Sequence, residues 1–149
     1  MRVLLISGEY PPYLFGGGAT FMYHLSRQLS ATDIETSVVA HKLIRNFSRF
    51  SRRTSLERPS KNLRIIWISI SAHTYPRHGV FQLFAKSVVR SIINDHDVIH
   101  LNTGLYYPWL RNILRKSGKP VIVTVHGLSL IHISEPTRPR LISYAVFCL

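Results

Sequence analysis

The opening stretch of the chain, Met1 to Leu29, limits the possible folds more than any other part of the sequence. It reads as a buried strand over Arg2–Ser7, a turn rich in proline and glycine, and a helix that begins near Ala19. A strand without polar alternation is typical of a parallel strand that is covered on both faces. The two prolines of the turn cannot donate to a sheet or enter a helix interior. The stretch therefore predicts an α/β fold that begins with a strand–turn–helix unit.

Three consecutive glycines, Gly16, Gly17 and Gly18, stand just before the predicted helix. Glycine lets the backbone approach a ligand closely, and the N–H groups of a helix's first turn favour an anion. These residues can therefore bind a phosphate or a sugar phosphate, or they can form a turn that only lets the helix pack on the strand. The spacing is not the G-x-G-x-x-G fingerprint of dinucleotide-binding proteins, and no Gly-Lys-Ser/Thr of a P-loop follows.

Strands and helices alternate along the rest of the chain. Further strands are predicted at Glu35–Ala40, Leu63–Ile70, Asp97–Leu101 and Val121–Val125, and further helices at Gly79–Asn94 and Tyr106–Ser117. This alternation predicts right-handed parallel crossovers and an open, doubly wound, Rossmann-like parallel sheet. Such sheets bind ligands beyond the carboxyl ends of their strands. The glycine turn, the residues after Leu101, and His126 are all expected at that edge.

Apolar residues recur at helical spacing in two of the predicted helices, as in helices that pack one face on a sheet. The predicted core-facing residues are Phe21, Met22, Leu25 and Leu29 in the first helix and Phe81, Phe84, Val88 and Ile92 in the second. The helix that ends at Ser117 is followed by Gly118 and Pro120, which is the punctuation expected after a helix C-terminus.

Two blocks of the sequence resemble family-4 glycosyltransferases. The first is G-E-Y-P-P, then G-G-G, then a helix of the form F-x-x-x-L-x-x-x-L; the second is Asp97–Asn102 followed by Lys119–Gly127, similar to the family's D-V-I-H … P-V-V-x-T-x-H-G segment. The resemblance covers Met1–Gly127. It implies the GT-B architecture, in which two Rossmann-like domains face a cleft. It also implies that this chain is the incomplete N-terminal, acceptor-side domain of a retaining, nucleotide-sugar-dependent hexosyltransferase.

The resemblance further implies roles for individual residues. Gly16, Gly17 and Gly18 would border the phosphates and sugar of the donor. His126 matches a family histidine that lines the active site near the transferred sugar, and we expect it to be catalytic. A histidine there can donate a hydrogen bond to a sugar hydroxyl or to a developing charge. By position alone, a capping or solvent-facing residue at a strand end is the favoured interpretation of His126, and the motif reverses that preference.

Three further residues are candidates for contact with the acceptor: Glu9, Asn102 and Thr103. Glu9 can orient an acceptor hydroxyl, or it can form a salt bridge within the first turn. Asn102 and Thr103 can contact the acceptor or stabilise a turn. His100, inside the fourth predicted strand, is expected to be a buried, hydrogen-bonded core residue.

Metal and cofactor chemistry finds no support in the sequence. The eight histidines are scattered, without paired spacing or carboxylate partners, so we predict no metal site. The nucleotide sugar is expected as a substrate and no cofactor is predicted. No segment is apolar for long enough to span a bilayer, and the apolar start lacks the other parts of a signal peptide. The single cysteine, Cys148, excludes an intrachain disulfide, and a cytoplasmic location is expected.

The formal net charge of +12 favours an anionic partner, and basic residues are concentrated between Lys42 and Lys61. We expect this segment to form a long basic loop, which can be simply solvated. It can also hold the protein against anionic lipid head groups at the inner membrane face, because some enzymes of the family use lipid-linked acceptors. Nucleic acid ranks last: Phe47 and Phe50 permit stacking, but no nucleic-acid-binding motif accompanies the charge.

The C-terminal residues resemble a translated sequencing-library adapter rather than protein sequence. Leu128–Arg138 and Ile142–Leu149 match two adapter segments, and Pro139–Leu141 has the length of a sample index between them. We therefore expect a native domain over 1–127, an artefactual tail over 128–149, and a missing second domain. The alternative is a genuine strand and helix that continue the domain.

These expectations lead to two hypotheses from different classes. The first is a glycosyltransferase fragment that acts on a glycan, lipid-linked or small-molecule acceptor in building cell-envelope polysaccharide and that is inactive without its second domain. The second is a stand-alone Rossmann-like module that binds a phosphorylated ligand or a polyanion without catalysis. The native sequence after Gly127 would discriminate between them.

Overall fold

The computed structural model describes residues 1–13, 16–44, 54–71, 77–102, 107–126 and 144–148. In chain order the elements are β1 (Arg2–Ile6), α1 (Gly17–Ala31), β2 (Glu35–Ile44), β3 (Thr54–Ser60), β4 (Leu63–Ser71), α2 (Arg77–Ile92), the 3₁₀-helix η1 (Ile93–Asp95), β5 (Val98–Leu101), α3 (Tyr107–Ser117), β6 (Val121–His126) and β7 (Tyr144–Cys148). Every predicted strand and helix is present, within a few residues of its expected ends.

The described strands form a sheet of seven in the order β3-β4-β2-β1-β5-β6-β7. The five central strands, from β4 to β6, are parallel, and the two outer strands are antiparallel to their neighbours. The central order is that of a Rossmann half, with the first strand in the middle. The prediction of a Rossmann-like parallel sheet is confirmed.

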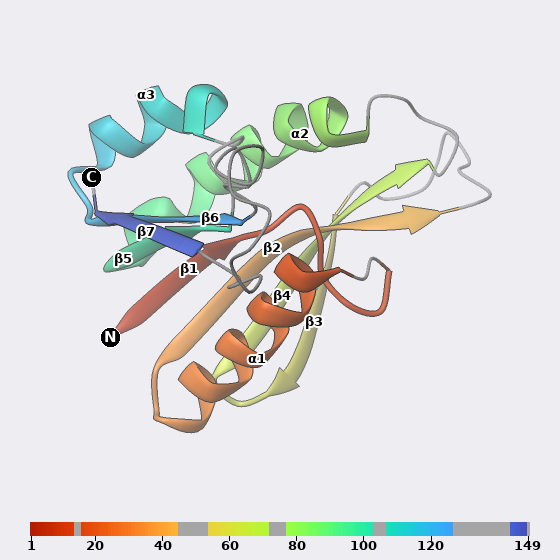
Figure 1. The fold of residues 1–149 in the computed structure, drawn as a ribbon, viewed down its shortest axis with the longest axis horizontal. Helices are drawn as coiled ribbons and strands as arrows, with labels where there is room; N and C mark the ends of the chain where they lie inside the picture. The colour runs from red at the N-terminus through yellow and green to blue at the C-terminus, as the bar shows by residue number, and fades with distance from the viewer. Residues whose placement is uncertain (14–15, 45–53, 72–76, 103–106, 127–143, 149) are drawn as a thin grey trace, which may run out of the picture.

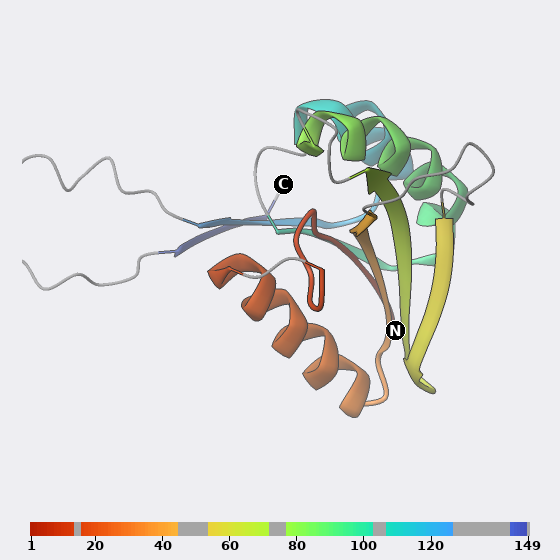
Figure 2. The same cartoon turned by 90° about the vertical axis from the view of Figure 1, so that its right-hand side faces the viewer.

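Helices cover both faces of this sheet (Figures 1 and 2). Helix α1 lies on one face, and α2 and α3 lie on the other. The β1 side chains alternate between the two layers, with Leu4 and Ile6 in the cluster beneath α2 and α3 and Val3 and Leu5 in the cluster beneath α1. Because both faces of β1 are buried, its apolar run has no polar interruption.

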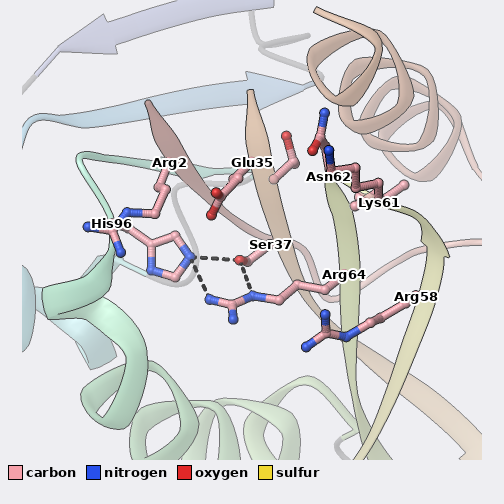
Figure 3. A pocket seen from close by; sticks show the side chains of 10 residues that line it. Arg2, Glu35, Ser37, Arg58, Lys61, Asn62, Arg64 and His96 are labelled. Atoms are coloured by element: carbon pink, nitrogen blue, oxygen red, sulfur yellow. Dashed lines mark hydrogen bonds between the residues drawn. The ribbon is translucent and has the colours of Figure 1, made fainter. Parts of the chain in front are cut away.

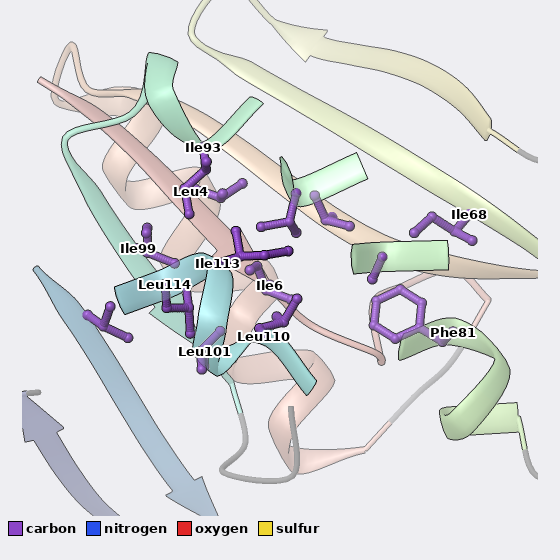
Figure 4. Packing of buried hydrophobic residues seen from close by; sticks show 14 of the residues in the cluster. Leu4, Ile6, Ile68, Phe81, Ile93, Ile99, Leu101, Leu110, Ile113 and Leu114 are labelled. Atoms are coloured by element: carbon purple, nitrogen blue, oxygen red, sulfur yellow. The ribbon is translucent and has the colours of Figure 1, made fainter. Parts of the chain in front are cut away.

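The larger core cluster lies between the sheet and the pair α2–α3 (Figure 4). Its labelled members are Leu4, Ile6, Ile68, Phe81, Ile93, Ile99, Leu101, Leu110, Ile113 and Leu114. Each fully buried side chain of this size contributes about 1.5–3 kcal/mol by leaving water. This cluster therefore fixes the position of β5, which carries part of the candidate site.

Most of the predicted helix residues pack against the core, but the most deeply buried positions differ in part from the prediction. In α1 the buried residues are Ala19, Met22 and Ser26, whereas Phe21 is 37% exposed. In α2, Phe81 is buried as predicted, but the stripe continues through Ala85 and Val89, while Phe84, Val88 and Ile92 are only partly buried. In α1 the small residues Ala19 and Ser26 face the sheet together with Met22, and a pattern of large apolar residues does not predict the two small ones.

The basic segment from Lys42 to Lys61 is not a single loop, so that prediction is wrong. Strand β2 continues to Ile44, and Thr54–Ser60 forms β3, antiparallel to β4. Every residue of β3 is exposed. The strand forms because its backbone pairs with β4 and because the indole Nε1–H of Trp67 donates to Glu57 Oε2 over 2.7 Å. An exposed edge strand needs no apolar alternation, so its composition resembled that of a loop.

Two features near the C-terminus complete the fold. Gly118 follows α3 with a φ of +62°, the left-handed conformation that glycine adopts after a helix end, as predicted. Tyr144–Cys148 pairs antiparallel with β6 as β7. Backbone pairing at a sheet edge accepts many sequences, so the assignment of 128–149 as an adapter-derived tail stays a prediction.

Candidate functional site

Three strand ends and one helix start meet at the carboxyl edge of the sheet. Ser7 follows β1, Asn102 follows β5, and His126 is the last residue of β6. Because β1 and β5 are adjacent parallel strands, and β6 is the next one, their carboxyl ends lie side by side. Helix α1 begins at Gly17 against the same edge, since the Gly18 carbonyl oxygen accepts a hydrogen bond from Asn102.

Asn102 is the centre of this arrangement, and its side chain is 5% exposed. Its Nδ2 donates to Ser7 Oγ over 3.0 Å and to the Gly18 carbonyl oxygen over 3.2 Å. A carbonyl can only accept, so the contact with Gly18 fixes which end of the amide is the donor. The Oδ1 atom is therefore the atom that faces His126, at 2.9 Å from its Nε2.

The orientation of Asn102 fixes the hydrogen bonding of His126. Since Oδ1 accepts, His126 Nε2 carries the proton and donates it. In the neutral ring the lone pair is then on Nδ1, and in the charged ring Nδ1–H becomes a second donor. The side chain of His126 is exposed, although its partner Asn102 is buried. The network thus holds an accessible imidazole by one nitrogen and presents the other.

The glycines differ in how closely their neighbours approach. A Cβ on Gly18 would lie 3.3 Å from Asn102 Nδ2 and 3.5 Å from His126 Cδ2, and a Cβ on Gly16 would lie 3.3 Å from Glu9 Oε2. A Cβ on Gly17 would have no heavy atom within 4 Å. Gly18 therefore lets α1 approach the polar network. The first N–H groups of α1 have no intrahelical partners, which favours an anion here.

Glu9 lies in the same region, as the sequence predicts. The Ser7 hydroxyl donates to the Glu9 main-chain carbonyl, which ties the first turn to the network around Asn102. The partly exposed carboxylate of Glu9 faces Gly16. The structure therefore brings together Glu9, Gly16, Gly18, Asn102 and His126. Of the other predicted residues, Gly17 starts α1 and Thr103 lies outside the described residues.

Phe21 is a site residue that sequence reasoning assigned to the core. Its ring centroid lies 5.4 Å from that of His126 and 6.3 Å from that of His100, both with edge-to-face geometry. The sequence does contain an indication of this role. Phe21 lies one helical turn after Gly17 and Gly18, which places its side chain near the start of α1. Phe21 packs beside the imidazole of His126 and gives the candidate site an apolar wall.

His100 packs against Phe21 from within the sheet. It is 8% exposed, and its Nε2 is 2.8 Å from Thr124 Oγ1, so the prediction of a buried, hydrogen-bonded histidine is confirmed. Burial, with a smaller contribution from His126, lowers the pKa of His100 to about 4. The ring of His100 is therefore neutral near pH 7 and places no charge beneath Phe21.

Within the described ranges, no group of three or more His, Cys, Asp or Glu side chains is arranged to hold a metal ion. No helix in the described part of the chain is long and apolar enough to cross a membrane.

One protein family and several solved structures are similar to this chain. The model of the family described as Glycosyltransferase Family 4 matches residues 15–147. Fourteen chains of solved structures match, among them the structure described as "Trehalose-6-phosphate from E. coli bound with UDP-2-fluoro glucose". That match has a TM-score of 0.48 and 11% sequence identity, and it covers 80% of this chain and 31% of the other. The chain thus spans about a third of that protein's length. No curated protein sequence matches.

Proposed function

The chain belongs to glycosyltransferase family 4, and from this premise we propose that it forms the acceptor-side domain of an enzyme that transfers a hexose from a nucleotide sugar to a hydroxyl group. The observation that carries the proposal is the hydrogen-bonded series Ser7–Asn102–His126 beside the glycine start of α1. It combines an oriented imidazole with an anion-favouring helix end, which suits a sugar attached to a diphosphate.

His126 is the proposed catalytic residue. Its Nε2–H is engaged by Asn102, so Nδ1 is the atom that would face the transferred sugar. In the neutral ring Nδ1 accepts a hydrogen bond from a sugar hydroxyl, and in the charged ring it donates one to a developing negative charge. Either bond would favour the transition state if it strengthens as the glycosidic bond breaks. Asn102 acts as a positioning residue, and Phe21 limits water beside the imidazole.

The glycines and Glu9 complete the proposal. Gly16, Gly17 and Gly18 would border the donor's phosphates, with the close approach allowed by Gly18. The carboxylate of Glu9, next to Gly16, would orient the acceptor hydroxyl. Thr103, which follows Asn102 in the sequence, would be a further contact to the acceptor. No metal has a role in this proposal.

The stereochemistry of the transfer, the class of acceptor and the cellular role are inferred from family membership alone. We infer a retaining transfer to a glycan, lipid-linked or small-molecule acceptor, in a cytoplasmic enzyme that contributes to cell-envelope polysaccharide. The donor half would come from a second domain, so the 149-residue chain alone is expected to be inactive. Contact with anionic lipid through Lys42–Lys61 is a further proposal, supported by the exposure of β3.

The first experiment is long-read sequencing of the source DNA across the codon for Gly127. We expect the reading frame to continue into a second Rossmann-like domain. The longer protein should then transfer sugar from a panel of nucleotide sugars, and His126→Ala should reduce kcat about 10²–10³-fold, whereas Arg111→Gln on α3 should not. A frame that instead encodes Leu128–Leu149 in genomic DNA would favour the binding module, and so would a longer protein whose rate is unchanged by His126→Ala.

A further inference from the structure

A pocket lies at the amino edge of the sheet, opposite the carboxyl edge that carries the candidate site (Figure 3). Its volume is about 190 Å³. It is lined by the starts of β1, β2 and β4, by Arg58 near the end of β3, by the turn between β3 and β4, and by the residue that follows η1. The candidate site of sugar transfer, which includes Gly16–Gly18 and is called the glycine site below, lies at the other end of β1. The two sites are therefore separated by the length of the strands.

The charge of this pocket is strongly unbalanced. Four cationic side chains line it, namely Arg2, Arg58, Lys61 and Arg64. The lining includes one carboxylate, that of Glu35. A second carboxylate nearby, Asp97, accepts a hydrogen bond from the main-chain N of Arg2 over 2.7 Å. A concave site with this excess of positive charge attracts anions.

A buried hydrogen-bonded relay orients Arg64. His96 is 1% exposed and its Nδ1–H donates to the Ile92 carbonyl oxygen over 2.7 Å, so Nε2 is an acceptor. The Ser37 hydroxyl donates to that Nε2 over 2.7 Å and accepts from Arg64 Nε over 2.7 Å. Arg64 Nη2 also lies 3.4 Å from His96 Nε2 (Figure 3).

The protonation state of His96 agrees with this relay. Burial lowers the pKa of His96, and the Arg64 guanidinium lowers it further, while the bond to the Ile92 carbonyl acts in the opposite direction. A neutral imidazole can accept from Ser37, whereas an imidazolium cannot. The relay therefore fixes the guanidinium of Arg64 through its Nε edge. Two of the five N–H donors of Arg64 are engaged in these contacts.

An oriented guanidinium with further cations beside it matches a phosphate group. Arginine forms paired N–H···O bonds with phosphate oxygens, and orienting the side chain in advance lowers the entropic cost of binding. The pocket is smaller than the roughly 300–1,000 Å³ of drug-sized sites, which suits a phosphate with a short substituent. None of the described lining residues is Phe, Tyr or Trp, so bases would have no stacking partner here.

We propose that this pocket, formed by Arg2, Arg58, Lys61 and Arg64 with Ser37 and His96, binds the phosphate of a phosphomonoester at a site separate from that of sugar transfer. The phosphate can belong to a soluble compound or to a lipid head group, because the recognising chemistry is the same. The proposal does not depend on the glycosyl transfer proposed above.

The test uses the 149-residue chain with inorganic phosphate as the probe. Phosphate replaces chloride at constant ionic strength and pH, and two quantities are followed: the Tm, and the ¹H–¹⁵N signal of Arg64 Nε. The variant Arg58→Gln/Lys61→Gln removes two exposed cations from the pocket. Its control, Arg111→Gln/Arg115→Gln, makes the same change in net charge on exposed residues of α3. Gly18→Ala, which places a Cβ at the start of α1, controls for phosphate bound at Gly16–Gly18.

We expect phosphate to raise the Tm and to shift the Arg64 signal in the wild type, the α3 control and Gly18→Ala. The pocket variant should bind at least about tenfold more weakly, as expected for the loss of two charge-assisted contacts. Sedimentation with phosphatidylcholine vesicles, with and without phosphatidic acid, then separates a lipid head group from a soluble phosphate. An unshifted Arg64 signal in the wild type, or equal weakening in the pocket variant and the α3 control, would overturn the proposal.

Discussion

The Nε2–H of His126 donates a hydrogen bond to Oδ1 of Asn102 over 2.9 Å. A side chain at the end of β6 is thereby oriented by a side chain that follows β5. Asn102 is oriented in turn by Ser7 and by the carbonyl of Gly18. The position of one accessible imidazole therefore depends on three other segments of the chain.

The first prediction concerns Asn102. Asn102→Ala removes the acceptor for His126 and leaves the buried Ser7 hydroxyl without this donor, so we expect a loss of about 1–3 kcal/mol in the free energy of unfolding. Urea denaturation measures this loss, and ¹⁵N spectra of His126 should show both neutral tautomers instead of one. Asn112→Ala, at an exposed position on α3, should change neither quantity. A His126 tautomer that is unchanged in Asn102→Ala would contradict the assigned network.

The second prediction compares two adjacent glycines. Alanine is favoured over glycine in a helix by up to about 1 kcal/mol, and a Cβ on Gly17 would meet nothing within 4 Å. Gly17→Ala should therefore leave the Tm unchanged or raise it. Gly18→Ala places a Cβ 3.3 Å from Asn102 Nδ2, so it should lower the Tm relative to Gly17→Ala and shift the His126 signals. Equal effects of both substitutions would show that α1 does not pack closely on the network.

The third prediction is a pH dependence of stability that arises from His100. Its pKa is lowered from 6.5 to about 4, so the unfolded state binds the proton more readily than the folded state. The stabilisation is complete above about pH 6.5 and is lost as the pH falls toward 4, by about 3 kcal/mol in total. Burial lowers the pKa of His96 too, which adds to the same slope.

The variant His100→Gln isolates this contribution, since glutamine can still reach the Thr124 hydroxyl but does not titrate. Urea denaturation between pH 4 and 7 should show a shallower loss of stability in this variant than in the wild type. His24→Gln, at an exposed position on α1, should retain the wild-type slope. Identical slopes in His100→Gln and the wild type would show that His100 does not control acid stability.

The fourth prediction concerns the residues after Gly127. If residues 128–149 are an adapter-derived tail, the native domain ends at Gly127 and does not depend on them. Ending the chain at Gly127 should therefore change the Tm by less than about 5 °C, which corresponds to roughly 1–2 kcal/mol for a chain of this length. Differential scanning calorimetry on both forms measures the change. A much larger loss would mean that β7 is an integral strand and that the division at Gly127 is wrong.

Local sequence determined the order of the strands and helices and the edge at which the candidate site lies. A parallel strand buried on both faces requires an uninterrupted apolar run, and a helix end after Ser117 requires a residue such as Gly118 that tolerates positive φ. Each of these requirements involves only a few neighbouring residues, so the sequence alone predicts the strand and the helix end. The Rossmann-like sheet follows from the alternation, and the carboxyl ends of adjacent parallel strands then bring Ser7, Asn102 and His126 to one edge.

Tertiary structure alone decided the contacts between these residues and the elements that lack an apolar pattern. Ser7 and Asn102 bond across 95 positions of sequence, and Ser37 meets His96 across 59. Strand β3 is exposed along its length and exists because its backbone pairs with β4. Phe21 faces His126 because α1 packs on the sheet through Ala19, Met22 and Ser26, which leaves Phe21 beside the imidazole. Such contacts depend on how whole elements pack, and no spacing within a single segment encodes that.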